Sequence, residues 1–168
     1  IVGSDTNGLQ NYDDLYADIL HWVKEGWIDY NMPQIYWEID HPAADYITLI
    51  QWWNKNATLE GPHLYIGQDV ARTMKASQLT RKMRYERALS KVKGNCFWPA
   101  NELLWNNKGV ADSLKRNYHR YPALIPAYTH MHNRAPQEVK KLKKEWTADG
   151  YMLHWKAEQS PTNPELAS

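Results

Sequence analysis

Apolar residues recur at helical spacing in four segments of the chain, and short apolar or alternating runs lie between these segments. The first helix is predicted to begin at Tyr12, with Asn11 as its cap, and to end at Gly26. The other three helices are predicted over residues 42–60, 77–91 and 109–118. The strand-like runs lie at residues 27–37, 63–67 and 95–98.

The order of these elements, a helix followed by three strand–helix units, predicts an α/β fold. Alternation of this kind indicates parallel strands that are joined by helical crossovers. Either an open doubly wound sheet or part of a (β/α) barrel would fit the pattern. No glycine-rich phosphate-binding loop follows any of the strand-like runs, which argues against an open sheet that binds nucleotides.

The last part of the chain has a different pattern. Residues 129–136 have the composition of a linker, and period-two alternation follows over 139–142 and 151–155. The segment Ala148-Asp149-Gly150 is predicted to form the turn between these two strands. Because two strands cannot bury a core by themselves, we expect them to open a small β domain that is cut short in this sequence.

Composition narrows the classes of function. The net charge is +1 and both signs are interspersed, so nothing favours binding to nucleic acid or to an anionic membrane. Nine Trp and eleven Tyr stand against one Phe, and such amphipathic rings suit sugar-binding grooves as well as cores. The only cysteine, Cys96, is expected to be a buried strand thiol. The seven His lack the spacing of metal ligands, so we predict neither a metal nor a cofactor.

Candidate chemistry is concentrated in residues 28–38. Side chains of a strand alternate between two faces, so Gln34, Tyr36 and Glu38 are expected on one face and Ile35 and Trp37 on the other. Ile35 suits a face that is covered by helices. The first three side chains would then point into the mouth of a barrel at the carboxyl end of the strand, where such barrels carry their active sites.

A carboxyl group among Trp and Tyr side chains is what glycoside cleavage uses, because the rings stack on sugar and an apolar wall raises the pKa of an acid. Glu38 is therefore the predicted catalytic acid, although it could instead be a solvated carboxylate that caps the next helix. Asp40 and His41 are expected to be capping residues, and Asp69 would serve equally well as a helix cap. The residues predicted to bind the sugar are Gln34, Tyr36, Trp37, Gln68 and Trp98.

Sequence blocks at residues 11–18, 22–30, 33–37 and 64–68 closely resemble glycosyl hydrolase-like family 10, a family of bacterial cell-envelope proteins. The resemblance covers about residues 4–127, and its most specific part is the block Pro33-Gln34-Ile35-Tyr36-Trp37. The segment from Ala135-Pro136 to Trp155 resembles the opening strands of a fibronectin type III domain.

The resemblance implies a (β/α)8 barrel of the TIM type that hydrolyses glycans, with peptidoglycan strands as the favoured substrate and with export to the cell envelope, often as a lipoprotein. Residues 1–128 would supply the helix after strand five and the last three βα units, residues 129–136 a linker, and residues 137–168 the start of the fibronectin-like domain. An acid near the end of strand six in related barrels supports Glu38.

The first half of the barrel, with the second carboxylate, would lie outside this sequence. We therefore expect the chain alone to be inactive, and to associate with that missing half or with a second copy. A carbohydrate-binding envelope protein without catalysis is the alternative, and a purely scaffolding piece is a third possibility. The leading hypothesis is a glycoside hydrolase whose acid/base residue is Glu38.

Overall fold

The computed structural model describes residues 4–5, 8–128 and 138–156. Its contacts divide the chain into two compact units, residues 1–132 and residues 133–168. In the part of the chain that is described, no helix is both long and apolar enough to cross a membrane.

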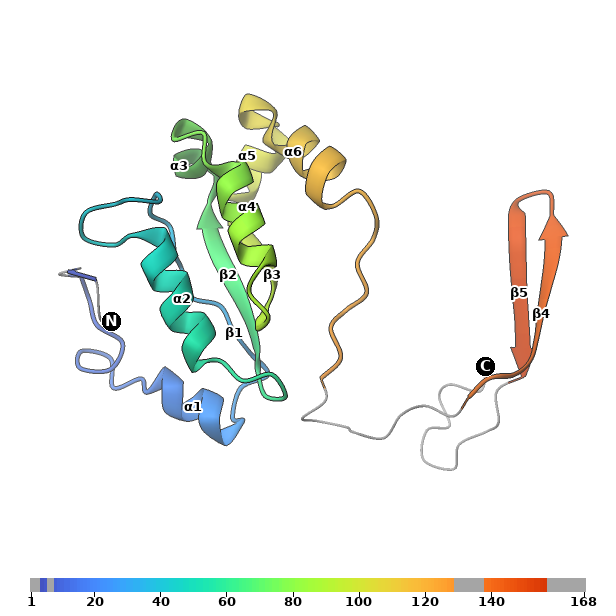
Figure 1. The fold of residues 1–168 in the computed structure, drawn as a ribbon, viewed down its shortest axis with the longest axis horizontal. Helices are drawn as coiled ribbons and strands as arrows, with labels where there is room; N and C mark the ends of the chain where they lie inside the picture. The colour runs from blue at the N-terminus through green and yellow to red at the C-terminus, as the bar shows by residue number, and fades with distance from the viewer. Residues whose placement is uncertain (1–3, 6–7, 129–137, 157–168) are drawn as a thin grey trace. The chain divides into compact units, whose positions relative to one another are not determined.

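A three-stranded parallel sheet in the order β1-β2-β3 forms the centre of the first unit (Figure 1). Its strands are β1 (Tyr30–Asn31), β2 (His63–Asp69) and β3 (Val92–Trp98). The first strand is shorter than the predicted run 27–37. Its direction is continued by a parallel bridge between Gln34 and Gly67, where Ile35 N donates to Gly67 O at 2.9 Å.

Among the residues that the structure describes, six α-helices connect and flank these strands. They are α1 (Ile19–Glu25), α2 (Tyr46–Asn56), α3 (Val70–Lys75), α4 (Leu79–Arg87), α5 (Ala100–Leu104) and α6 (Val110–Ser113). A 3-10 turn (Asn107–Gly109) precedes α6, and a π-helical turn (Leu114–Tyr118) follows it. The alternation of strands and helices is therefore as predicted, whereas α3 and α5 are additional short helices.

The first helix begins later than predicted, at Ile19 rather than at Tyr12. The Asp18 carboxylate accepts a hydrogen bond from His21 N at 3.0 Å and so caps it. The side chains of Tyr12 and Leu15, whose spacing suggested a helical face, are exposed. The start of this helix is thus set by Asp18, and Asn11 does not serve as the cap.

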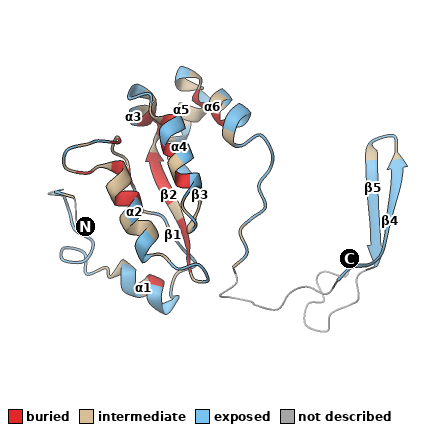
Figure 2. Ribbon diagram, viewed as in Figure 1, coloured by how far each residue is buried: buried red, intermediate tan, exposed pale blue. Residues whose placement is uncertain are grey.

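Helices α2 and α4 cover one face of the sheet, and the buried residues gather between these layers (Figures 1 and 2). Ile35, Leu64 and Ile66 of the sheet side pack in one cluster with residues from α2 and the loop before it. The members of that cluster are Ile35, Ile39, Ala44, Tyr46, Leu49, Ile50, Leu64 and Ile66. A second cluster comprises Val70, Leu79, Met83, Val110 and Leu114. The architecture is therefore mixed α/β, with its core on the helical side of the sheet.

The described part of the second unit is an antiparallel hairpin of β4 (Lys140–Thr147) and β5 (Gly150–Lys156). Its strands enclose the predicted turn, and Trp146 lies opposite Tyr151 with ring centroids 4.6 Å apart. The predicted linker, residues 129–136, lies entirely outside the described residues. The hairpin provides the two predicted strands, although the first continues to Thr147.

Candidate functional site

The candidate site lies at the carboxyl ends of the parallel strands, on the face of the sheet that turns away from α2 and α4. Ile35 is buried among the helices, so the alternating neighbour Tyr36 lies on the opposite face. A Cβ atom built on Gly67 would stand 3.6 Å from the Tyr36 ring. Burial raises the pKa of the Tyr36 phenol, and neighbouring Cys96 and Asp69 raise this pKa further. Tyr36, Asp69 and Cys96 are thus brought together.

Glu38 follows this segment and is partly buried. Its carbonyl accepts a hydrogen bond from Tyr46 N at 3.3 Å. The cap of α2 is another residue, Asp45, whose Oδ2 accepts from Thr48 N at 2.7 Å and from Thr48 Oγ1 at 2.9 Å. The Glu38 carboxylate therefore does not have the helix-capping role that was the alternative to a catalytic one.

Asp40 and His41 stabilise the loop before α2. Asp40 N donates to Asp45 Oδ1 at 2.7 Å, and His41 Nδ1 accepts from the amides of Ala43 and Ala44 at 3.3 and 3.2 Å. His41 therefore does not cap α2, contrary to the prediction, because the amides that it accepts from precede the cap residue Asp45. Asp40 instead takes part through its backbone, while its carboxylate accepts from Arg81 at 3.1 Å.

The remaining predicted side chains at this end of the sheet differ in their surroundings. Asp69 caps α3, because its Oδ1 accepts from Arg72 N at 2.8 Å. Trp98 lies opposite Asp69 in the register of β2 and β3, and its side chain is exposed. Gln34 is exposed, whereas Trp37 is partly buried and packs against the helix-side core. Of these, Trp98 and Gln34 are accessible to a ligand.

Gln68 is placed differently from the prediction. It is fully buried on the helix-covered face, and its Nε2 donates to Glu86 Oε1 of α4 at 2.6 Å. Gln68 shares this face with Leu64 and Ile66, as the period of two requires. A side chain in this position cannot line a sugar groove on the opposite face, so we assign Gln68 to the core.

A buried polar cluster behind the strand ends was not predicted. Lys82 and Glu86 of α4 are both buried, and Glu86 also accepts hydrogen bonds from the Tyr46 hydroxyl and the Asn95 amide. Burial raises the pKa of Glu86 to about 7, although hydrogen bonds from Tyr46 and Gln68 and the charge of Lys82 act in the opposite direction. Residues 77–91 are less cleanly amphipathic than the other predicted helices, and this irregularity was the one signal in the sequence for buried polar residues there.

Lys82 lies in the same buried region. Its Nζ donates to Trp37 O at 2.8 Å and to Thr73 Oγ1 at 3.0 Å, and it lies 4.3 Å from the centroid of the Tyr46 ring. Burial lowers the pKa of Lys82 to about 8, while the negative charges of Glu38, Glu86 and Asp69 oppose that shift. A cation therefore sits directly behind the segment that carries Glu38.

The open face of β3 changes the interpretation of Cys96. Its side chain is exposed, so the prediction of a buried thiol is wrong. It shares a face with Gly94, which lies against the Tyr65 ring, and with Trp98. Neither α2 nor α4 covers this face, because both pack on the opposite side of the sheet.

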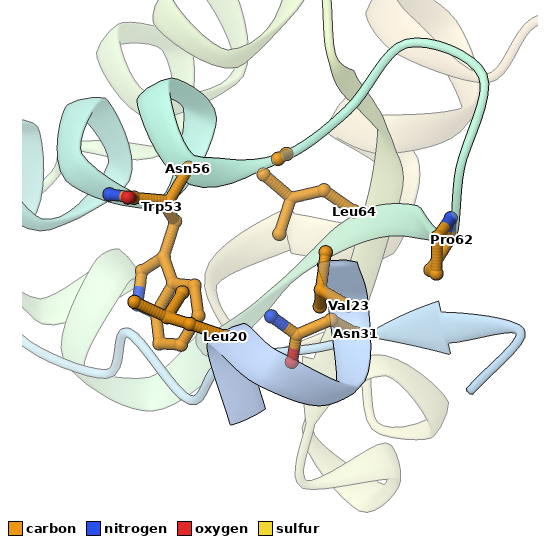
Figure 3. Close-up of a pocket in the computed structure, with 8 residues that line it drawn as sticks. Leu20, Val23, Asn31, Trp53, Asn56, Pro62 and Leu64 are labelled. Atoms are coloured by element: carbon orange, nitrogen blue, oxygen red, sulfur yellow. The ribbon is translucent and has the colours of Figure 1, made fainter. Parts of the chain in front are cut away.

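A small crevice lies at the other end of the sheet, near the start of β2 (Figure 3). The residues that line it are Leu20, Val23, Asn31, Trp53, Asn56, Ala57, Pro62 and Leu64. None of them has a titratable side chain. The crevice is therefore a gap in the packing of α1 and α2 against the sheet, and the candidate chemistry lies elsewhere.

Comparison with known proteins gives a consistent set of relatives. The family model described as Glycosyl hydrolase-like 10 matches residues 2–84. Glycosyl hydrolase YngK of Bacillus subtilis (strain 168) is 37% identical over 164 residues, which cover 92% of this chain and 32% of that protein. Glycosyl hydrolase DigH of Escherichia coli (strain K12) is 46% identical over 66 residues, or 39% of this chain and 15% of that protein. The chain thus spans a third or less of the length of these relatives.

Proposed function

Because this chain belongs to the glycosyl hydrolase-like 10 family, we propose that the protein containing it hydrolyses glycosidic bonds and that Glu38 is one of its catalytic carboxyl groups. The observation that carries this proposal is that successive side chains of residues 35–38 lie on opposite faces of the sheet. Ile35 faces the helices, Tyr36 faces the open side, and the Glu38 carboxylate is left without the helix-capping role.

The aromatic side chains near Glu38 support a sugar as the ligand. Tyr36 lies on the open face, and the exposed indole of Trp98 is available to stack on a pyranose ring. Gln34, which forms the parallel bridge to Gly67, adds an exposed side-chain amide close to Tyr36. In this proposal Tyr36, Trp98 and Gln34 bind the glycan, whereas Trp37 and Gln68 support the site from the core.

Glycoside hydrolysis uses two carboxyl groups that flank the bond. Asp69 is near Tyr36, but it already caps α3. We therefore propose that the second carboxyl group comes from a part of the protein outside this chain. The parallel strands with helices on one face would then form the last three βα units of a (β/α)8 barrel, whose interior lies on the side of Tyr36 and Cys96.

For the substrate we propose a cell-envelope glycan, with peptidoglycan strands as the favoured example, and for the protein an exported location. These two points rest on the family resemblance alone. We also propose that the hairpin of β4 and β5 begins a fibronectin type III-like domain, which its alternating apolar residues support.

The test is the Glu38→Gln variant of the full-length protein. Loss of a general acid should reduce glycan turnover by roughly two or more orders of magnitude, while binding survives because Tyr36 and Trp98 remain. Glu60→Gln, which changes an exposed glutamate between α2 and β2, is the matched control and should keep full turnover. Release of reducing ends from peptidoglycan strands is the measurement.

Two results would count against this proposal. Undiminished turnover in Glu38→Gln would show that the catalytic acid is another residue. A wild-type protein that is retained on glycan but releases no reducing ends would be a carbohydrate-binding protein without catalysis.

A further inference from the structure

Three consecutive residues in the loop between the Gln34 bridge and α2, residues 37–39, are each fixed by hydrogen bonds to their backbone. Trp37 O accepts from Lys82 Nζ at 2.8 Å, and Glu38 O accepts from Tyr46 N at 3.3 Å. Gln78 holds the third residue on both sides, since its Oε1 accepts from Ile39 N at 2.7 Å and its Nε2 donates to Ile39 O at 3.2 Å. The backbone that carries Glu38 is therefore tied to the region of α4 and to α2.

Lys82 differs from the other two supports because it is a fully buried cation. Burial of an ammonium group is unfavourable unless it gains hydrogen bonds and opposite charge. Two neutral oxygens, Trp37 O and Thr73 Oγ1, accept from it, and the Tyr46 ring lies against it. The carboxylates of Glu38, Glu86 and Asp69 favour its charged form.

The hydrogen bond from Lys82 Nζ to Trp37 O bears directly on Glu38. This carbonyl belongs to the peptide group that links Trp37 to Glu38, and a peptide group is planar. Fixing its oxygen therefore fixes the plane in which the Glu38 nitrogen lies and restricts the direction of the Glu38 side chain. An apolar side chain of similar length could fill the same space but could not hold this oxygen.

We propose that Lys82 is a positioning residue for Glu38: from behind the sheet it holds the Trp37–Glu38 peptide in the orientation that presents the Glu38 carboxyl group at the strand end. This inference rests on the proposed function insofar as Glu38 is the catalytic carboxyl group. Lys82 lies on the helix-side face and does not touch the glycan.

The experiment uses the full-length protein with Lys82→Met, which keeps the length of the side chain and removes its donor. Hydrogen exchange of peptides from residues 36–45 should rise by about tenfold or more relative to peptides from β3, because the segment opens locally. For glycan cleavage, kcat should fall by about tenfold or more while KM changes little, as expected for a misplaced catalytic group.

Two control variants separate positioning from stability. Thr73→Val removes the other acceptor of Lys82 but leaves its bond to Trp37, and should leave exchange of residues 36–45 unchanged. Arg84→Met changes an exposed cation of the same helix and should be neutral in both measurements. If Lys82→Met does not fold, Lys82→Arg replaces it, and a rise in exchange of about threefold is expected from its poorer fit in the buried space.

The two measurements distinguish failure of this inference from failure of the proposed function. Unchanged exchange of residues 36–45 in the folded Lys82 variant would overturn the positioning role, whether or not the protein cleaves glycan. The same holds if exchange rises equally in every part of the first unit, since that would be a loss of overall stability. If the wild type does not cleave glycan but hydrogen exchange of residues 36–45 still rises in Lys82→Met, then Lys82 positions this segment and the glycosidase function is rejected.

Discussion

The side-chain amide of Gln68 donates a hydrogen bond of 2.6 Å to Oε1 of Glu86, and both residues are buried between β2 and α4. Glu86 also accepts from Tyr46 of α2 and from Asn95 of β3. One carboxyl group therefore connects two helices to two strands. A polar cluster of this kind stabilises a fold only while its members keep their partners, because an unpaired buried polar group is unfavourable.

Replacement of Gln68 by Leu should therefore destabilise the first unit. The variant removes a donor to a buried carboxyl group, and the expected loss in the free energy of unfolding is about 1–3 kcal/mol. The loss is moderated because Gln68 Oε1 has no hydrogen-bond partner among the described residues, so one unsatisfied acceptor disappears as well. Urea unfolding followed by tryptophan fluorescence is the measurement, with the exposed Gln10→Leu as the control.

The Gln68→Leu variant also tests whether Gln68 binds sugar, as the sequence suggested, or supports the core. Its folded form should bind glycan as wild type does, because the side chain lies on the helix-covered face. A Gln68→Leu protein that is as stable as wild type but no longer binds glycan would restore the role in sugar binding that the sequence suggested.

The pH dependence of stability should carry a contribution from Glu86. Burial raises the pKa of this carboxyl group from 4.5 to about 7 in the folded protein. Between these two values the folded state keeps a proton that the unfolded chain has released, so the free energy of unfolding falls as the pH rises through this window. The contribution present at low pH and lost by pH 7 is of the order of 3 kcal/mol.

Glu86→Gln should remove this contribution, since an amide does not titrate. The difference in unfolding free energy between the variant and wild type should therefore shift in favour of the variant from pH 5 to pH 7. This range lies below the pKa of about 8 for Lys82, so the lysine stays mainly charged. Urea titrations of both proteins at the two pH values test this prediction, and a difference that does not change with pH would contradict it.

Local periodicity in the sequence was sufficient to place the strand side chains. The assignment of Ile35 and Tyr36 to opposite faces followed from the pleat of the strand, which depends only on neighbouring residues. The same rule puts Gln68 on the face of Leu64 and Ile66. The prediction that Gln68 binds sugar rested on its amide group and its place near the end of the strand, and it did not apply this rule.

Tertiary packing decided the features that the sequence could not supply. Asn11 and Asp18 are both residue types that commonly cap helices. Only Asp18 precedes a helix that is anchored to the core, through the buried side chain of Val23. Lys82 and Glu86 would ordinarily be assigned to a solvated face, since charged residues are rarely buried without partners. Their partners Trp37, Asn95 and Gln68 come from distant parts of the chain, so their burial depends on the assembled sheet.

The close approach of two backbones at Gly67 yields a prediction about the geometry of the site. Gly67 N donates to Pro33 O, and Ile35 N donates to Gly67 O, both at 2.9 Å. A Cβ atom on residue 67 would lie 3.1 Å from Pro33 O and 3.3 Å from Gln34 Cα. Both are backbone atoms, which cannot rotate away as the end of a flexible side chain could.

Gly67→Ala should therefore push residues 33–35 away from β2 and weaken the bridge that orders the segment before Tyr36. Such overpacking is expected to reduce the free energy of unfolding by about 1–3 kcal/mol. Glycan affinity should fall as well, because Gln34 and Tyr36 move with this segment in the proposed site. Gly8→Ala is the matched control, since a Cβ there meets nothing within 4 Å. Equal stability and affinity of the two variants would show that the 33–35 segment adapts and that Gly67 is not needed for the site.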